Sequence, residues 1–405
     1  MQQPRNASVS GRVNPVLAVL SPGQGSQKPG FLSGWLDLPG AEARLTWWSA
    51  LAGLDLIQLG TTAGAEEIKD TARTQPLLVA AALLAAEHLP MYDVGLVAGH
   101  SIGELAATAL AGVLPAEAAI TLAGVRGREM AAACTLEATG MSAVLGGDAD
   151  EVIAAIERHG LYPANRNGAG QIVAAGTLDG LAKFAAEPPA KARVIALQVA
   201  GAFHTPYMAP AEQALSAVAS GVTVADPARI LLSNLDGAAV IHGREMVQRL
   251  VRQVTAPVRW DLVMRTLRDL GVTGIIELPP AGTLAGLAKR ELKGENAPEI
   301  VTLNTPDDLP AARDLIARHG TASTHEPTPL FRVVVAPSAG LFQPAEGLAE
   351  GVDLRQGQVI GQVTTRQGPV EVAAHAAGIL TEWLAHHDDP VAPGQPVARI
   401  GGHQL

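Results

Sequence analysis

The sequence predicts an α/β protein in three parts: a parallel-sheet domain, an inserted subdomain and a C-terminal all-β domain. From Val16 to about Ala133, short aliphatic runs alternate with alanine-rich helical stretches, as in a parallel sheet covered on both faces. Residues 141–200 instead follow a β-α-β-β-α-β order, which is the ferredoxin-like pattern. After a proline-containing linker, the last part of the chain contains an internal repeat of two β-rich halves.

The individual elements follow from these patterns. In the first part we expect Pro76 to lie in the first turn of its helix, where a missing N–H costs nothing. The strands expected there are 16–20, 94–98, 230–234 and 274–278, and the helices are 75–88, 104–110 and 244–254. In the inserted part the strands are 141–145, 161–165, 171–175 and 192–199, and the helices are 150–159 and 179–186.

The repeat follows a polar, proline-containing segment, 321–329, which reads as a linker. Residues 336–342 resemble residues 374–380, and residues 357–363 resemble residues 394–400. Matching turns in two halves predict a small β-sandwich with near two-fold symmetry.

Composition narrows the class of protein. A chain of 405 residues that is 48% hydrophobic can bury the cores of more than one domain. A net charge of −10 and 3% aromatic residues argue against a nucleic-acid partner. The single cysteine, Cys134, excludes an internal disulfide and fits a reducing compartment. Because no apolar run is long enough for a membrane helix or a signal peptide, we expect a soluble cytoplasmic protein without a membrane partner.

The strongest chemical signal is Gly99-His100-Ser101-Ile102-Gly103, which lies between an apolar strand and a helix. This arrangement is typical of a nucleophile elbow, in which glycines allow a tight turn and a helix start stabilises negative charge. It predicts an acyl-enzyme on Ser101. Glycine-rich turns are common, however, so an ordinary tight turn is the competing interpretation.

A serine nucleophile also needs a base and donors for the oxyanion. The best base is His204, which lies where the chain returns from the inserted part, although the chain has 11 histidines. One oxyanion donor is the N–H of Ile102, and a second would come from the loop 21–27 after the first strand. This loop lacks the lysine-serine ending of a phosphate-binding loop, so nucleotide binding is disfavoured, and no metal-ligand pattern appears.

Arg126 lies on the next expected helix, 25 residues after Ser101. An arginine directed into an apolar crevice can hold a carboxylate with two hydrogen bonds. Taken alone, a solvated surface arginine is the commoner interpretation.

Six ordered motifs now resemble the acyltransferase family of malonyl-CoA:acyl carrier protein transacylases and the acyltransferase domains of polyketide synthases. The resemblance covers roughly residues 16–305 and implies an α/β-hydrolase-like domain with a ferredoxin-like insertion. The motifs are Gly23-Gln24-Gly25-Ser26-Gln27, Thr74-Gln75-Pro76, Gly99-His100-Ser101-Ile102-Gly103-Glu104, Arg126-Gly127, Gly201-Ala202-Phe203-His204 and Pro257-Val258-Arg259-Trp260.

The resemblance implies a role for each site residue. Ser101 is then the nucleophile, and His204 is its base. Gln24 and the Ile102 N–H line the oxyanion hole, Arg126 binds the malonyl carboxylate, and a backbone carbonyl at Gln253 orients the histidine. Three further positions match the family near its active site: Asn165, Asn167 and Phe203, the last in a malonyl-selective pattern. One departure is Glu277-Leu278-Pro279-Pro280-Ala281-Gly282, where the family usually has Gly-Pro-Gly; we expect it to alter a surface loop.

The tail resembles a biotinyl/lipoyl domain, but residues 321–405 contain no lysine, so covalent biotin or lipoate is excluded and no cofactor is expected. We expect a protein partner for this tail.

The domain limits are 14–136 with 200–305 for the core, 137–199 for the ferredoxin-like subdomain, 306–329 for the connector and linker, and 330–405 for the tail. The function implied is transfer of malonyl from malonyl-CoA to acyl carrier protein in fatty acid or polyketide synthesis. The alternatives are a different acyl specificity, thioester hydrolysis, and a scaffold acting through the tail.

Overall fold

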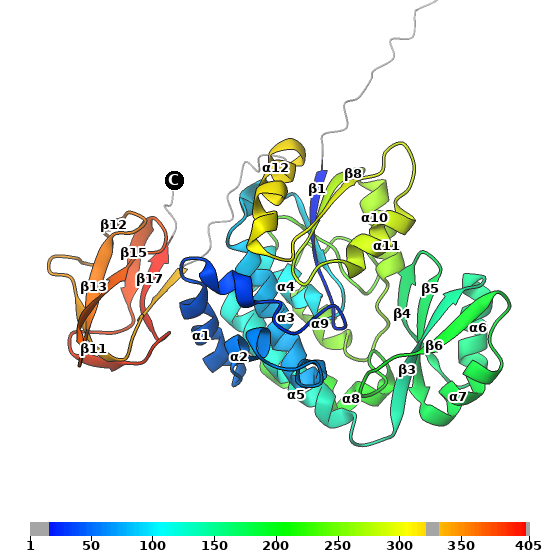
Figure 1. Ribbon diagram of the computed structural model, residues 1–405. Helices are drawn as coiled ribbons and strands as arrows, with labels where there is room; N and C mark the ends of the chain where they lie inside the picture. Colours follow the sequence, from blue (N-terminus) through cyan, green and yellow to red (C-terminus); the bar gives the residue numbers. More distant parts are fainter. Residues whose placement is uncertain (1–15, 321–331, 402–405) are drawn as a thin grey trace, which may run out of the picture.

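A five-stranded parallel sheet forms the centre of the structure, a computed structural model that describes residues 16–320 and 332–401 (Figure 1). The strand order is β7-β2-β1-β8-β9, and every neighbouring pair is parallel, as the sequence predicts. The strands are β1 Val16–Ser21, β2 Leu96–Gly99, β7 Ile230–Leu231, β8 Val272–Glu277 and β9 Glu299–Thr302.

Helices cover both faces of this sheet because successive strand residues point to opposite sides. Leu17 and Val19 of β1 enter the larger core, whereas Ala18 and Leu20 enter a second core on the other face. The helices of the larger core are α1 Ala41–Ala52, α2 Leu56–Thr61, α3 Thr71–Ala86, α4 Gly103–Leu110, α5 Ala116–Ala133, α8 Ala209–Ala219, α9 Gly243–Arg252 and α12 Leu309–His319. Those of the second core are α10 Trp260–Asp269 and α11 Thr283–Glu291.

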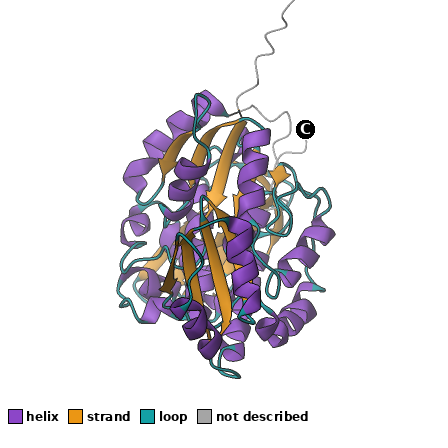
Figure 2. Ribbon diagram, turned by 90° about the vertical axis from the view of Figure 1, so that its right-hand side faces the viewer, coloured by secondary structure: helices purple, strands orange, loops and turns teal. Residues whose placement is uncertain are grey.

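A four-stranded antiparallel sheet, with strand order β4-β5-β3-β6, forms the inserted part. Its helices pack on one face, and Met141 and Val173 on the other face join the larger core. Figure 2 looks onto the side of the molecule where this sheet lies. The chain order is the predicted one: β3 Thr139–Gly146, α6 Ala149–Arg158, β4 Tyr162–Gly168, β5 Gln171–Thr177, α7 Leu178–Ala186 and β6 Ala192–Ala196.

The C-terminal part consists of β-strands in two four-stranded sheets, β10-β17-β15-β12 and β14-β13-β11-β16. The strands are β10 Arg332–Val335, β11 Gly340–Pro344, β12 Asp353–Leu354, β13 Val359–Thr365, β14 Gly368–Ala373, β15 Gly378–Trp383, β16 Asp389–Val391 and β17 Pro396–Gly401. They enclose a separate apolar core.

Backbone hydrogen bonds show that the internal repeat is structural. The N–H of Gly357 donates to the carbonyl of Ala374 at 2.7 Å, and the N–H of Gly394 donates to that of Ala336 at 2.8 Å. The two glycines have φ angles of 80° and 79°, values that favour glycine. Each half therefore closes its turn on the start of the other half, as expected for near two-fold symmetry.

The C-terminal part lies against α1, on the side of the molecule opposite the inserted sheet (Figure 1). A Cβ on Gly394 would come within 2.8 Å of the Thr46 side chain in α1. The contact is therefore so close that only glycine fits at this turn.

Three predicted limits, one of a helix and two of strands, are wrong near the site. Helix α3 begins at Thr71 rather than at residue 75, because the Asp70 side chain accepts the N–H of Ala72 and caps the helix. Pro76 therefore lies inside the helix and not in its first turn. The strand expected over 230–234 ends at Leu231, and the strand expected over 192–199 ends at Ala196.

The expected connector 306–329 is wrong over its first half. Residues 309–319 form α12, whose buried face packs against β1, β8 and β9. The linker expected over 321–329 lies outside the described residues.

Pro279 and Pro280 are buried, so the departure from the Gly-Pro-Gly pattern is not in a surface loop. Short 3₁₀ helices complete the fold: η1 Ser33–Asp37, η2 Glu67–Lys69, η3 Met91–Asp93, η4 Pro206–Met208 and η5 Pro306–Asp308.

Candidate active site

The turn between β2 and α4 holds Ser101 in a left-handed conformation with φ of 53°. A Cβ on Gly99 would collide with the carbonyl of Gly103, and one on Gly103 would collide with the carbonyl of Ser21. Glycine is therefore required on both flanks of the serine, since no larger residue leaves room for the turn. The turn places the Ser101 side chain at the N-terminal end of α4, where the helix dipole is positive.

His204 reaches Ser101 from the segment that follows β6. Its Nε2 lies 2.7 Å from Ser101 Oγ, and its Nδ1 lies 2.7 Å from the backbone oxygen of Gln253. A carbonyl oxygen can only accept, so Nδ1 carries the proton and the lone pair of Nε2 faces the serine hydroxyl. Burial, and next the charge of Arg126, lower the pKa of His204 to about 3. The imidazole is therefore neutral at pH 7 and able to accept the serine proton.

Arg126 of α5 brings a buried positive charge to the same place, with 2% of the residue exposed. Nη1 donates to Oε1 of Gln75 at 2.6 Å, and Nη2 donates to Oε1 of Gln253 at 2.9 Å and to Ser101 Oγ at 3.3 Å. Burial lowers the pKa of Arg126 to about 10, so it stays charged at pH 7. The guanidinium is thus oriented by two neutral amides within reach of the serine oxygen.

Two backbone N–H groups are available beside the serine. Those of Ile102 and Gln24 donate to no acceptor within the described residues. The lack of a side chain at Gly23 lets the loop that carries the Gln24 N–H approach the serine turn, since a Cβ on Gly23 would lie 2.9 Å from the carbonyl oxygen of His100. The Gln24 side chain turns away, with Nε2 at 3.3 Å from the Lys69 carbonyl oxygen. An oxyanion hole requires N–H donors that no protein acceptor occupies, and within the described residues the N–H groups of Ile102 and Gln24 meet this requirement.

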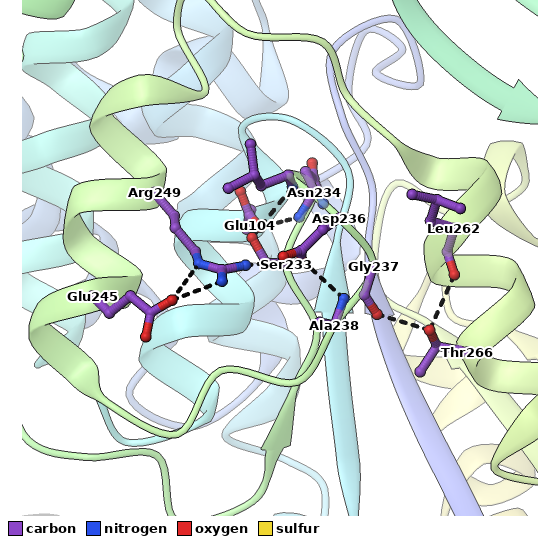
Figure 3. A network of polar contacts seen from close by, with 11 residues as sticks. Glu104, Ser233, Asn234, Asp236, Gly237, Ala238, Glu245, Arg249, Leu262 and Thr266 are labelled. Carbon is purple, nitrogen blue, oxygen red and sulfur yellow. Dashed lines mark hydrogen bonds and ion pairs between the residues drawn. The ribbon is translucent and has the colours of Figure 1, made fainter.

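Three buried residues of the site were missed by the sequence analysis as site residues: Gln75, Glu104 and Asn234. Oδ1 of Asn234 accepts the Ser101 N–H at 2.8 Å, and its Nδ2 donates to the Gly99 carbonyl at 2.7 Å. Glu104 in turn accepts the Asn234 N–H at 2.6 Å (Figure 3). The sequence did hold a signal for each of them. Gln75 and Glu104 belong to motifs shared with the acyltransferase family, and Asn234 ends an expected strand.

The remaining expected residues lie further from the serine. Asn167 accepts from Nε2 of His100 at 2.9 Å, and the His100 ring stands edge-on to Trp260 at 5.5 Å. The His100 ring is thus engaged by Asn167 and Trp260 and not by Ser101. Asn165 pairs through its backbone with Val258, and Phe203 is buried in the larger core. No hydrogen bond joins Asn165, Asn167 or Phe203 to Ser101, His204 or Arg126 in the described part of the chain.

Residues 16–320 and 332–401 contain no group of three or more His, Cys, Asp or Glu residues that could hold a metal ion. No helix there is both long and apolar enough to span a bilayer.

Comparison with known proteins agrees with this geometry. The family model described as "Acyl transferase domain" matches residues 20–321. The malonyl CoA-acyl carrier protein transacylase of Mycobacterium tuberculosis is 56% identical over 299 residues, which are 73% of this chain and 98% of that protein. The Escherichia coli protein of the same name is 31% identical over 314 residues, covering 74% of this chain and 99% of its own.

Solved structures give the same result. The crystal structure of the Mycobacterium tuberculosis protein has 55% identity and a TM-score of 0.71, and it covers 74% of this chain and 99% of its own. A malonyl transacylase in complex with its type II polyketide synthase acyl carrier protein has 28% identity and a TM-score of 0.67, and it covers 74% of this chain and 99% of its own. The family match ends at residue 321, so the C-terminal β-strands lie beyond it.

Proposed function

The chain belongs to the acyl transferase family, and from this premise we propose that it moves malonyl from malonyl-CoA to the phosphopantetheine thiol of acyl carrier protein. The observation that carries the proposal is that one oxygen, Ser101 Oγ, lies 2.7 Å from a neutral histidine and 3.3 Å from a buried arginine. The first contact suits acyl transfer, and the second suits an acyl group that bears a carboxylate.

In the first half-reaction, Ser101 Oγ attacks the thioester carbonyl while Nε2 of His204 takes its proton. The oxyanion is received by the N–H groups of Ile102 and Gln24. When the tetrahedral intermediate collapses, the carbon–sulfur bond breaks and the proton passes from His204 to the sulfur of coenzyme A. The product is a malonyl ester on Ser101.

The second half-reaction runs the same steps with the carrier thiol as nucleophile. His204 takes the thiol proton, the sulfur attacks the ester carbonyl, and the proton returns to Ser101 Oγ. The carbonyl of Gln253 holds the Nδ1 proton throughout, so the histidine keeps one tautomer and orientation.

Arg126 selects the acyl group in this proposal. Its side-chain hydrogen-bond partners are the amides of Gln75 and Gln253 and the hydroxyl of Ser101, all of them neutral, so they orient the guanidinium without cancelling its charge. A carboxylate entering this buried site would gain a charge-assisted bond that a neutral acetyl group cannot make. Phe203, Asn165 and Asn167 keep their proposed substrate-binding roles from the family resemblance.

The C-terminal part is, we infer, a biotinyl/lipoyl-like domain that carries no covalent cofactor. The two-fold hydrogen-bond pattern supports the domain type, and the hairpin between β13 and β14 has Arg366 and Gln367 at its turn. Without a lysine in residues 321–405, no amide to biotin or lipoate can form. We propose that this domain binds a protein partner, and that the enzyme acts in the cytoplasm, as its single cysteine favours.

Three experiments test these proposals. Incubation with malonyl-, methylmalonyl- or acetyl-CoA and intact-mass measurement should show loading with malonyl in preference to the others. Addition of acyl carrier protein should then discharge the enzyme faster than water does, which separates transfer from hydrolysis. A covalently bound biotin or lipoate in the purified chain would contradict the inference about the C-terminal domain.

A further inference from the structure

A buried carboxylate lies directly beneath the serine turn. Glu104, the second residue of α4, is 1% exposed. Its Oε1 accepts the backbone N–H of Asn234 at 2.6 Å, and its Oε2 accepts Nε2 of Gln253 (Figure 3 shows the Asn234 side). The catalytic steps described above make no use of this group, although burying a carboxylate is costly.

The Glu104 carboxylate is the charged one of three acceptors that face the Nε2 end of the Gln253 amide; another is Oδ1 of Asn234 at 3.2 Å. An ionised carboxylate has no proton to donate, so it requires the NH₂ end of the amide to face it. The same Nε2 also donates to the Ser101 carbonyl at 3.1 Å. The oxygen end, Oε1, must then face the opposite way, and there it accepts from Nη2 of Arg126 at 2.9 Å.

A rotated amide would change the site without moving the backbone. If Nε2 faced Arg126, two donors would oppose each other, and the guanidinium would lose its bond to Gln253 and keep those to Gln75 and Ser101 Oγ. The carbonyl of Gln253, which accepts from His204, would stay in place. Acyl selection and acyl transfer are therefore separable at this residue.

We propose that Glu104 is a positioning residue for acyl-group selection, which acts by fixing the Gln253 amide and, through it, the Arg126 guanidinium. The proposal rests on the proposed function, since it concerns the same carboxylate-binding arginine. Burial raises the pKa of Glu104 to about 7, while its bonds from Asn234 and Gln253 and the charge of Arg126 act in the opposite direction. The ionised form that the orientation needs therefore prevails only above about pH 7.

The test is Glu104→Gln, which keeps the shape and removes the charge. Steady-state transfer to acyl carrier protein is measured with malonyl-CoA and acetyl-CoA, and the ratio of the two kcat/KM values is compared. Because a hydrogen bond to a charged group is stronger than one to a neutral amide, the malonyl-to-acetyl ratio should fall about tenfold, which corresponds to about 1.4 kcal/mol. Most of the fall should be in the KM for malonyl-CoA, with acetyl transfer nearly unchanged.

A double mutant shows whether Glu104 acts through Gln253. Gln253→Leu should lower the ratio to a similar extent, and the pair Glu104→Gln with Gln253→Leu should lose no more than Gln253→Leu alone. The matched control is Glu277→Gln, since Glu277 is equally buried but accepts N–H groups at the start of α11, such as that of Leu284. The Glu277→Gln variant should be less stable than the wild type but should keep its malonyl-to-acetyl ratio.

The outcomes separate this inference from the proposed function. A wild-type enzyme without malonyl preference, or one whose preference survives Arg126→Ala, would contradict the proposed function. If Arg126→Ala abolishes the preference and Glu104→Gln keeps it, only the role of Glu104 is wrong. Losses that multiply in the double mutant would also overturn it. Should Glu104→Gln not fold, Glu104→Asp keeps the charge but withdraws it from Gln253, and an unchanged ratio there contradicts the inference.

Discussion

Ser101 and His204, which face each other across 2.7 Å, both have left-handed backbone conformations, with φ angles of 53° and 60°. Such conformations are unfavourable for residues with a Cβ and tend to occur where function requires them. Here each one has a visible support: the Asn234 side chain accepts the Ser101 N–H, and the Gln253 carbonyl fixes the His204 ring. The pair is held in place by its surroundings at the expense of local backbone energy.

Replacement of Ser101 should reveal this strain. Glycine tolerates a positive φ and alanine does not, so Ser101→Gly should be more stable than Ser101→Ala by about 1 kcal/mol. Chemical denaturation of the two variants measures the difference. Ser142, buried in the extended strand β3, is the control, and there alanine should be more stable than glycine. Equal stabilities at position 101 would contradict the strain.

Loss of the Arg126 charge should change which acyl group is transferred. Arg126→Ala should lower kcat/KM for malonyl-CoA by about two orders of magnitude, because a buried charge-assisted bond is worth roughly 3 kcal/mol. Transfer of acetyl should not fall in parallel. Arg128, an exposed residue of the same helix, is the control, and Arg128→Ala should change neither activity. Unchanged malonyl transfer by Arg126→Ala would be inconsistent with the carboxylate role.

The histidine should make stability depend on acid pH. Burial, chiefly, depresses the folded-state pKa of His204 from its ordinary value of about 6.5 to about 3. Below pH 6.5 the unfolded chain binds a proton at this histidine and the folded protein does not, so the free energy of unfolding falls. The stability is therefore fully present above pH 6.5 and is lost as the pH falls towards 3, by at most about 1.4 kcal/mol per pH unit.

Unfolding free energies of wild type and His204→Asn, measured between pH 7 and the lowest pH at which both fold, test this. The wild-type curve should be the steeper one below pH 6.5. Parallel curves for wild type and His204→Asn would show that His204 is not held neutral by burial.

The catalytic part should not need the C-terminal strands. Every residue of the proposed machinery lies between Gln24 and Gln253, and the family match ends at residue 321. A chain ending at residue 320 should therefore keep malonyl transfer within about threefold of the full chain, a difference of less than 1 kcal/mol.

A chain ending at residue 305 is the contrasting variant. It lacks α12, whose Leu315 and Ile316 are fully buried against the sheet, and burial of such side chains stabilises by about 2 kcal/mol each. It should unfold or aggregate, as measured by its melting temperature. A stable, active chain ending at 305 would mean that α12 is dispensable, as a core that ends at residue 305 implies.

The sequence predicted most of what depends on local patterns. Aliphatic runs located the parallel strands, and the motifs brought together Ser101, Arg126 and His204, although 103 residues separate the serine from the histidine. The helix α12 was missed because its start, with Asp307, Asp308 and Pro310, resembles a linker. Its buried residues nevertheless have the three- and four-residue spacing of an amphipathic helix.

The buried polar network could not be predicted in the same way. Whether Glu104 is exposed or buried depends on α9 and on the loop after β7, which lie about 130 to 150 residues away in the chain. The same is true of Asn234, whose contacts to Gly99 and Ser101 exist only in the folded protein. Local propensity gives no information about such distant partners.

The most direct test of the central claim is to identify the residue that carries the malonyl group. The enzyme is incubated briefly with malonyl-CoA, quenched in acid and measured by intact mass, and the modified peptide is then sequenced. One malonyl group per chain on Ser101, absent in Ser101→Ala and discharged onto acyl carrier protein, is the predicted result. A malonyl group on another residue, or undiminished loading and transfer by Ser101→Ala, would contradict the account.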